Sequence, residues 1–175
     1  KPGFRSISIG NDHLLRINGN ASRIRGVAMY NDRAGVGSAL RSEHIAEDIS
    51  LISEIGANMI RMVTSPAASG YLDECDRRGI GVWCDIPLVN SPFLADVPYT
   101  TSPALAESGR EQLREIIAQN YNRPSVLMWG IFSKLVVPGD DPRPYIRELN
   151  SLAKNLDPSR PTVAVSNQDG DINFI

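Results

Sequence analysis

The sequence has 175 residues, of which 42% are hydrophobic and 22% are charged, a composition typical of a soluble globular domain. A formal net charge of −2 gives no electrostatic reason to expect a nucleic acid or an anionic membrane as a partner. No apolar run approaches the ~20 residues that cross a bilayer, and Lys1–Arg5 contains no apolar signal core. The location therefore stays open between the cytoplasm and a periplasmic or secreted compartment. Two cysteines, Cys75 and Cys84, are too few for a disulfide scaffold or a zinc cluster, and we expect both to be reduced, buried thiols.

The first 22 residues predict a β-hairpin. Arg5–Ile9 and Leu14–Ile17 alternate loosely between polar and apolar residues, and Gly10–Asp12 supplies a turn between them. Asn18-Gly19 is a dipeptide that favours a tight chain reversal. We therefore assign residues 1–22 to a hairpin that leads into a domain formed by residues 23–175.

From residue 23 onward, predicted strands alternate with predicted helices. The strands are almost continuously apolar, as strands buried on both faces are, and the helices repeat apolar residues at helical spacing. The expected strands cover residues 23–30, 59–63, 80–87, 125–132 and 162–166, with the start of a sixth at 172–175. The expected helices begin near Ser42, Gly70, Ser102 and Pro142, with Ser42 and Ser102 as N-caps.

This alternation indicates an α/β fold with a parallel sheet. The sequence contains neither the glycine-rich dinucleotide fingerprint nor a P-loop, so a nucleotide site is not predicted. A (β/α)8 TIM barrel takes roughly 250 residues, and this chain holds about five to six βα units, so we predict a partial TIM barrel preceded by a short β-hairpin. Because an incomplete barrel has unpaired strand edges, we expect a homodimer through those edges or a complementing C-terminal barrel segment.

Several motifs resemble those of the catalytic barrel of family 2 glycoside hydrolases, the β-galactosidase and β-glucuronidase relatives. The resemblance runs almost from end to end of the chain. Its most specific part is the stretch Gln119–Val126 leading into Trp129-Gly130. The other matching stretches are Gly3–Arg5, Asn18-Gly19, Arg25–Val27, Asp32-Arg33, Gly56–Arg61, Cys75-Asp76, Gly79-Ile80, Val82-Trp83 and Asp157–Thr162.

The resemblance implies a retaining hydrolase of terminal β-linked sugars, with one glutamate after an asparagine at the end of strand four and a second at the end of strand seven. In this sequence the Asn-Glu pair is replaced by Ser133-Lys134, and the strand-seven segment is not in the chain. Since retaining hydrolysis needs both carboxyl groups, the sequence as written predicts no glycosidase activity.

Other departures from the family pattern fall at strand ends. Met29-Tyr30 stands where relatives have Arg-His, Thr64-Ser65 where they have His-Tyr, and Cys84-Asp85 where they have Ala-Glu. Barrel enzymes keep their chemistry at the carboxyl ends of the strands. Coordinated replacement at these positions indicates a rebuilt active site, natural or engineered.

Lys134 and Asp85 are the candidate catalytic residues. A lysine at a strand end near apolar neighbours could lose its proton and form a Schiff base with a carbonyl substrate, as in aldolase or retro-aldolase chemistry. The alternative is that its ammonium pairs with Asp85 or reaches solvent. Asp85 could orient or deprotonate a water molecule, or serve only as that ion-pair partner.

The candidate substrate-binding residues surround this pair. They are Tyr30, Met29, Thr64, Ser65, Ser133 and Trp83. Tyr30 offers a hydroxyl for a substrate oxygen, and Trp83 is either an aromatic platform for a sugar or a core residue. The two histidines, His13 and His44, lie far from the predicted strand ends, so a nucleophile–histidine dyad is not expected.

Three functional hypotheses follow, all with a small molecule or carbohydrate as ligand and without a metal or a cofactor. The first is a family 2-like barrel that has lost glycosidase activity. The second is a barrel enzyme of another class that uses Lys134 as an imine-forming amine. The third is a carbohydrate-binding remnant.

Overall fold

The computed structural model describes residues 3–87, 100, 102–133 and 140–165. Its first element is a small antiparallel sheet of strands β1 (Ile7–Ile9), β2 (Leu15–Ile17) and β3 (Asn20–Ala21). The predicted hairpin is present as β1 and β2. The chain then turns back once more to form β3, because Asn18 and Gly19 adopt positive φ angles of 52° and 78°.

The remaining strands form a five-stranded parallel sheet in the order β4-β5-β6-β7-β8. Its strands are β4 (Gly26–Met29), β5 (Met59–Met62), β6 (Gly81–Asp85), β7 (Val126–Ser133) and β8 (Thr162–Val165). The helices between them are α1 (Ser42–Glu54), α2 (Ser69–Arg78), α3 (Pro103–Asn120) and α4 (Arg143–Leu156). One helix joins each strand to its neighbour, so the α/β partial-barrel fold class is confirmed. The sixth strand expected at 172–175 lies outside the described residues.

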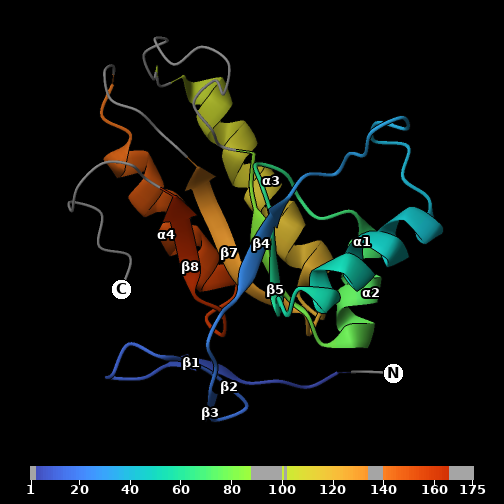
Figure 1. The fold of residues 1–175 in the computed structure, drawn as a ribbon. Coiled ribbons are helices and arrows are strands. Elements are labelled where there is room, and N and C mark those ends of the chain that lie inside the picture. The colour runs from blue at the N-terminus through green and yellow to red at the C-terminus, as the bar shows by residue number, and fades with distance from the viewer. Residues whose placement is uncertain (1–2, 88–99, 101, 134–139, 166–175) are drawn as a thin grey trace.

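All four helices pack on one face of the parallel sheet (Figure 1). Their apolar faces meet the side chains of alternate strand residues in one continuous core. This core includes Ile49, Leu72, Leu113 and Ile146 from the helices and Ile60, Val82, Cys84 and Trp129 from the strands, all 0–1% exposed. Burial of this apolar surface is the main force that holds the helices against the sheet.

The small sheet lies at the end of the barrel wall where the parallel strands begin (Figure 1). Ile7, Leu15 and Ile17 from its strands pack against a second core cluster of Met59, Leu127 and Met128. Trp83 and Val163 contribute to the same cluster. The hairpin therefore covers the amino end of the sheet.

A buried ion pair fastens this amino end. Asp157 and Arg160 are 0% and 4% exposed, and the Asp157 carboxylate also accepts a hydrogen bond from Trp129 Nε1 at 3.0 Å. The Arg160 guanidinium donates to backbone carbonyls, including that of Val126 at 2.8 Å. The Arg5 guanidinium also donates to the Val126 carbonyl and ties the N-terminal segment to β7.

The pKa of the Asp157 carboxyl reflects these contacts. Burial alone raises this pKa, but hydrogen bonds from Ser159, Arg160 and Trp129 outweigh the burial and hold it below its ordinary value. Asp157 therefore stays ionised in the folded protein.

Strand β4 is shorter than the predicted strand at 23–30. Over residues 23–25 the backbone bonds to the Asn58 side chain and not to a neighbouring strand. Asn58 Oδ1 accepts from Arg25 N at 2.8 Å, and Asn58 Nδ2 donates to Arg23 O at 2.9 Å. Side-chain bonds satisfy this backbone, so the ladder with β5 begins only at Gly26.

The start of α1 also differs from the prediction. Arg41, not Ser42, is the N-cap residue, and the Ser42 hydroxyl lies 3.4 Å from the Glu43 carboxylate instead of capping the helix. His44 Nδ1 accepts from Arg41 N at 3.3 Å. Ser102 does cap α3 as predicted, accepting from Leu105 N at 3.0 Å.

Replacing Arg160 by Met should destabilise the fold strongly. The change leaves the Asp157 carboxylate buried without its cation, and such a loss costs about 3–5 kcal/mol in the free energy of unfolding. Urea denaturation followed by circular dichroism measures it. Arg110→Met is the matched control, because Arg110 pairs with exposed Glu107 and Glu148 and its loss should leave the unfolding midpoint nearly unchanged. Equal midpoints for both variants would contradict the assigned role of Arg160.

Candidate functional site

Polar side chains gather at the carboxyl ends of β5, β6 and β7. On β5, Ile60 and Met62 pack against the helices, so Arg61 between them faces the opposite side of the sheet. The same alternation on β6 places Trp83 and Asp85 on that side. The strand register sets Arg61 beside Trp83 and Asp85 beside Gly130 of β7. This face of the sheet, at the carboxyl ends of its strands, is the candidate site.

A buried ion pair forms the centre of the site. Arg61 donates to Asp85 Oδ2 from Nε at 3.1 Å and from Nη2 at 2.7 Å. Asp85 is 0% exposed, and the guanidinium lies over the Trp83 ring with Cζ 4.5 Å from its centroid. Arg61 Nη2 also donates to the Ser133 hydroxyl at 3.0 Å, so one arginine links three strands.

The pKa of the Asp85 carboxyl is raised, and burial is the largest cause. The hydrogen bonds and charge of Arg61, and the Thr64 N–H at 3.2 Å from Oδ2, favour the ionised form without cancelling the effect of burial. A carboxyl of this kind holds a proton more tightly than an exposed aspartate does.

The second carboxylate oxygen of Asp85 is crowded against Gly130. Asp85 Oδ1 and Trp83 Nε1 are both buried beside Gly130, and the indole N–H lies close enough to the carboxyl group to favour its ionised form. A Cβ atom on Gly130 would lie 1.9 Å from Asp85 Oδ1 and 2.5 Å from Trp83 Nε1. Only glycine leaves room for both side chains, so Gly130 is part of the construction of the site.

Asn31 fixes the loop between β5 and α2. Its Nδ2 donates to Ser65 Oγ at 2.9 Å and to Pro66 O at 2.7 Å, and its Oδ1 accepts from Ala68 N at 3.2 Å. Thr64, in the same loop, has a φ angle of 54°, in the left-handed region, and its N–H donates to Asp85 Oδ2. The loop is therefore bonded to the end of β4 on one side and to β6 on the other.

The structure brings together four of the predicted site residues, Asp85, Ser133, Thr64 and Trp83, around Arg61. Ser65 is adjacent and bonded to Asn31, while Tyr30 follows β4 and is 58% exposed. Met29 packs against the core on the helix side, so it does not share a face with Arg61 and Asp85. Lys134 lies outside the described residues.

Sequence reasoning missed Arg61, Asn31 and Gly130 as site residues. The sequence did contain a signal for Arg61, because it is a charged residue inside the apolar run Met59–Val63. A charge in a buried strand needs a partner, and Asp85 is the carboxylate at the end of the next strand.

The cysteines do not take part in this site. Both thiols are free and buried, and Cys84 faces the helices. Burial raises the pKa of Cys84 to about 11 and that of Cys75 to about 12, so both stay protonated near neutral pH. Over the described residues, no group of three or more His, Cys, Asp or Glu side chains is arranged to hold a metal ion, and no helix is long and apolar enough to span a membrane.

Comparison with known sequences places this geometry in a family context. Residues 7–175 match the family described as glycosyl hydrolases family 2, TIM barrel domain. A β-glucuronidase of Bacteroides fragilis is 43% identical over 173 residues, which is 99% of this chain and 25% of that protein. A β-galactosidase of Thermoanaerobacter pseudethanolicus is 29% identical, over 94% of this chain and 21% of that protein. The chain thus spans about a quarter of the length of the curated relatives it matches.

Solved structures give the same picture. A β-D-glucuronidase of Dictyoglomus thermophilum superposes with a TM-score of 0.86 at 27% identity, over 95% of this chain and 29% of that one. A family 2 β-galacturonidase of Eisenbergiella tayi, solved with bound galacturonate, gives 0.82 at 31% identity, over 94% and 28% of the two chains.

Replacing Gly130 by Ala should displace the Asp85 carboxylate and the Trp83 ring. The added methyl group overlaps both, and overpacking of this kind costs about 1–3 kcal/mol in the free energy of unfolding. We expect a lower urea midpoint together with a shifted tryptophan emission maximum. Gly26→Ala is the matched control, because a Cβ there meets its nearest atom at an ordinary 3.7 Å. If the emission maximum and the urea midpoint of the Gly130 variant were unchanged, a side chain at position 130 would not clash with Asp85 and Trp83, which would contradict the role given to Gly130.

Proposed function

The chain belongs to family 2 of the glycosyl hydrolases, and we propose that it is part of a barrel that binds a terminal β-linked uronic acid or galactose but does not cleave it by the retaining mechanism. The sugar class is supported by the names of the relatives, which are β-glucuronidases, a β-galacturonidase and β-galactosidases. The loss of cleavage is supported by the residues at the end of β7.

One observation carries the loss of cleavage. β7 is the fourth strand of the parallel sheet and ends at Ser133, which is 1% exposed and bonded to Arg61. The Asn-Glu pair that the family resemblance implies at this point is therefore Ser133-Lys134. A retaining enzyme needs a carboxyl group there that first donates and then accepts a proton. A lysine with an ordinary pKa of about 10.4 holds its proton too tightly near neutral pH to donate it and then take it back.

Asp85 is a poor substitute for the missing acid. It lies on the neighbouring strand, it is 0% exposed, and its Oδ2 already accepts from Arg61 and from the Thr64 N–H. A leaving-group oxygen would have to displace those donors or reach the crowded Oδ1 beside Gly130. Asp85 is better suited to holding Arg61 in place.

The site keeps groups that suit sugar binding. Arg61 stacks on Trp83, and among the described residues its Nη1 atom has no acceptor, so this edge of the guanidinium is available to a sugar carboxylate. Thr64 and Ser65 add hydroxyl groups beside it. A cation with a free edge favours a uronic acid over a neutral galactoside.

A second candidate function is imine chemistry at Lys134. The alternative fate of Lys134, an ion pair with Asp85, is weakened because Asp85 already has a cation partner in Arg61. Lys134 is the next residue after Ser133, which accepts from the Arg61 guanidinium, and a fixed positive charge lowers the pKa of an amine that comes close to it. A lysine that loses its proton for these reasons could attack an aldehyde or a ketone.

Restoring the acid tests the first proposal. In the full-length protein, release of methanol from methyl β-D-glucuronide, whose leaving group departs only when it is protonated, should not exceed the rate in buffer, whereas Lys134→Glu should raise it at least about 100-fold, the usual contribution of a general acid. Lys134→Gln has nearly the same size and no acidic proton, so it should stay inactive. Turnover by the unmodified protein, or equal rates for the Glu and Gln variants, would refute the proposal.

Reductive trapping tests the second candidate. An activated amine condenses with benzaldehyde, loses water to form an imine, and is fixed as a secondary amine when borohydride delivers hydride to the imine carbon. The chain has three lysines, so peptide mapping by mass spectrometry can distinguish Lys134 from Lys1 and Lys154. Preferential labelling at pH 7 that disappears in Lys134→Met but persists in Lys154→Met would support imine chemistry. Equal labelling of all three lysines would exclude it.

A further inference from the structure

Thr64 adopts a backbone conformation that its side chain disfavours. Its φ angle is 54°, and a side chain branched at Cβ crowds the backbone in this left-handed region. In the described part of the chain, the other non-glycine residues with a positive φ are His13 and Asn18, which are unbranched and lie in turns of the small sheet. A strained conformation persists only where neighbouring contacts hold it, and such conformations cluster at functional sites.

Asn31 supplies the contacts that hold this loop. Its Nδ2 donates to Ser65 Oγ at 2.9 Å and to Pro66 O at 2.7 Å, and its Oδ1 accepts from Ala68 N at 3.2 Å. All three partners lie in the four residues that follow Thr64. One side chain after β4 therefore fixes the whole segment between Thr64 and the start of α2.

The conformation of Thr64 bears directly on the buried ion pair. The Thr64 N–H donates to Asp85 Oδ2 at 3.2 Å, the same oxygen that accepts from Arg61 Nε and Nη2. Burial raises the pKa of Asp85, and the Thr64 N–H is one of the contacts that oppose this rise. Without that N–H, Asp85 takes up a proton more readily, and Arg61 loses the partner that holds its guanidinium in place.

We infer that Asn31 is a positioning residue of the sugar site. It keeps Thr64 in the left-handed conformation, and Thr64 in turn fixes Asp85 and the Arg61 guanidinium in the arrangement that meets the carboxylate of a uronic acid. A group held in place before binding loses less freedom when the ligand arrives. The inference rests on the proposed function, in which Arg61 binds the sugar carboxylate.

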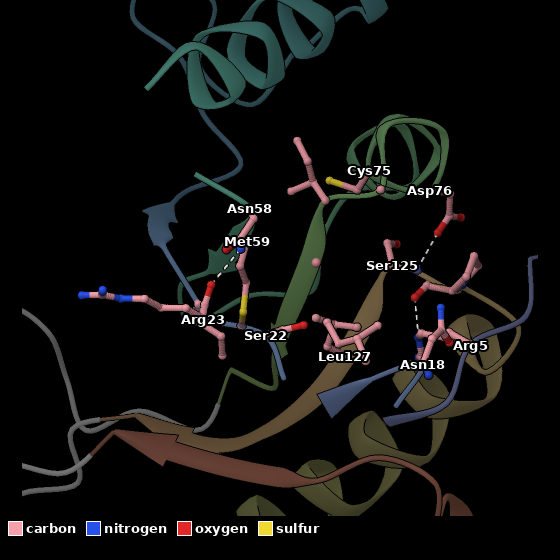
Figure 2. Close-up of a pocket in the computed structure, with 16 residues that line it drawn as sticks. Arg5, Asn18, Ser22, Arg23, Asn58, Met59, Cys75, Asp76, Ser125 and Leu127 are labelled. Atoms are coloured by element: carbon pink, nitrogen blue, oxygen red, sulfur yellow. Dashed lines mark hydrogen bonds between the residues drawn. The ribbon is translucent and has the colours of Figure 1, made fainter. Parts of the chain in front are cut away.

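Calorimetric titration of the full-length protein with methyl β-D-glucuronide tests the inference. Asn31→Ala should weaken the affinity about tenfold, because the loop and the Arg61 side chain must then be ordered on binding. Asn58→Ala is the matched control, since Asn58 also bonds to backbone 33 and 35 positions away, but at the amino end of the sheet. Figure 2 shows this end, with the Asn58 side chain bonded to the backbone of Arg23. The control should lower the urea midpoint and leave the affinity unchanged, and an equal loss of affinity in both variants would contradict a positioning role.

Thr64→Gly tests the route by which Asn31 acts. Glycine adopts the left-handed conformation without strain, so the loop needs less support from Asn31. In the Thr64→Gly background, Asn31→Ala should therefore weaken the affinity no more than about threefold. The same tenfold loss in both backgrounds would overturn the inference, because Asn31 would not act through Thr64.

Hydrogen exchange at the Thr64 amide gives a readout that needs no ligand. Asn31→Ala should speed this exchange at least about tenfold, measured by mass spectrometry with fragmentation to single residues, whereas Asn58→Ala should not. Asn31→Ser, whose hydroxyl is too short to reach all three partners, should act in the same way and covers a failure of Asn31→Ala to fold. Unchanged exchange would overturn the inference. Faster exchange, in a protein whose unmodified form binds no glucuronide, would refute the proposed function and still support the hold of Asn31 on Thr64.

Discussion

A buried charge must have a partner, and this requirement determines how the side chains are arranged at the carboxyl ends of β5, β6 and β7. Asp85 is fully buried, and Arg61 reaches across from the neighbouring strand to neutralise it. Three other features follow from that contact. Thr64 adopts a left-handed backbone so that its N–H meets the same carboxylate oxygen, Ser133 turns its hydroxyl to the guanidinium, and residue 130 has no side chain because the carboxylate occupies that space. Arg61 and Asp85 are bonded mainly to each other, and this limits the reactions in which either side chain can take part.

The two ends of the parallel sheet solve the same electrostatic problem with different results. At the amino end, Asp157 and Arg160 are both almost completely buried, and they bond to each other, to Trp129 Nε1 and to the Val126 carbonyl. At the carboxyl end, Arg61 is partly exposed, with a side-chain exposure of 16%, and its Nη1 beside the Trp83 ring has no acceptor in the part of the chain that the structure describes. A fully buried ion pair only stabilises the fold, whereas a partly exposed ion pair can also bind a ligand. This contrast is consistent with the general rule that barrel enzymes place stability at one end and chemistry at the other.

The sequence predicted the class of fold well because that class depends on patterns that are local. Apolar runs such as Met59–Val63 and Val126–Phe132, separated by amphipathic helices, are sufficient to indicate a parallel sheet. The candidate site was only partly predictable, because it depends on which face of the sheet each strand residue points to. Met29 and Thr64 both stand at strand ends, yet the alternation of side chains sends Met29 to the helix side. The roles of Asn31 and Asn58 were hidden for another reason: each bonds to backbone more than thirty residues away, and no short pattern reveals such a partner.

The anchoring of the first residues has a consequence for how the chain acquires its structure. Arg5 donates to the carbonyls of Pro124 and Val126, 119 and 121 positions along the sequence, and Ile7, Leu15 and Ile17 rest on a cluster that includes Leu127 and Met128. The Arg5 bonds and the contacts with Leu127 and Met128 form only when β7 is in place, and contacts between residues so far apart in the sequence form slowly. The small sheet of β1, β2 and β3 should thus dock late in folding, after the parallel sheet has assembled.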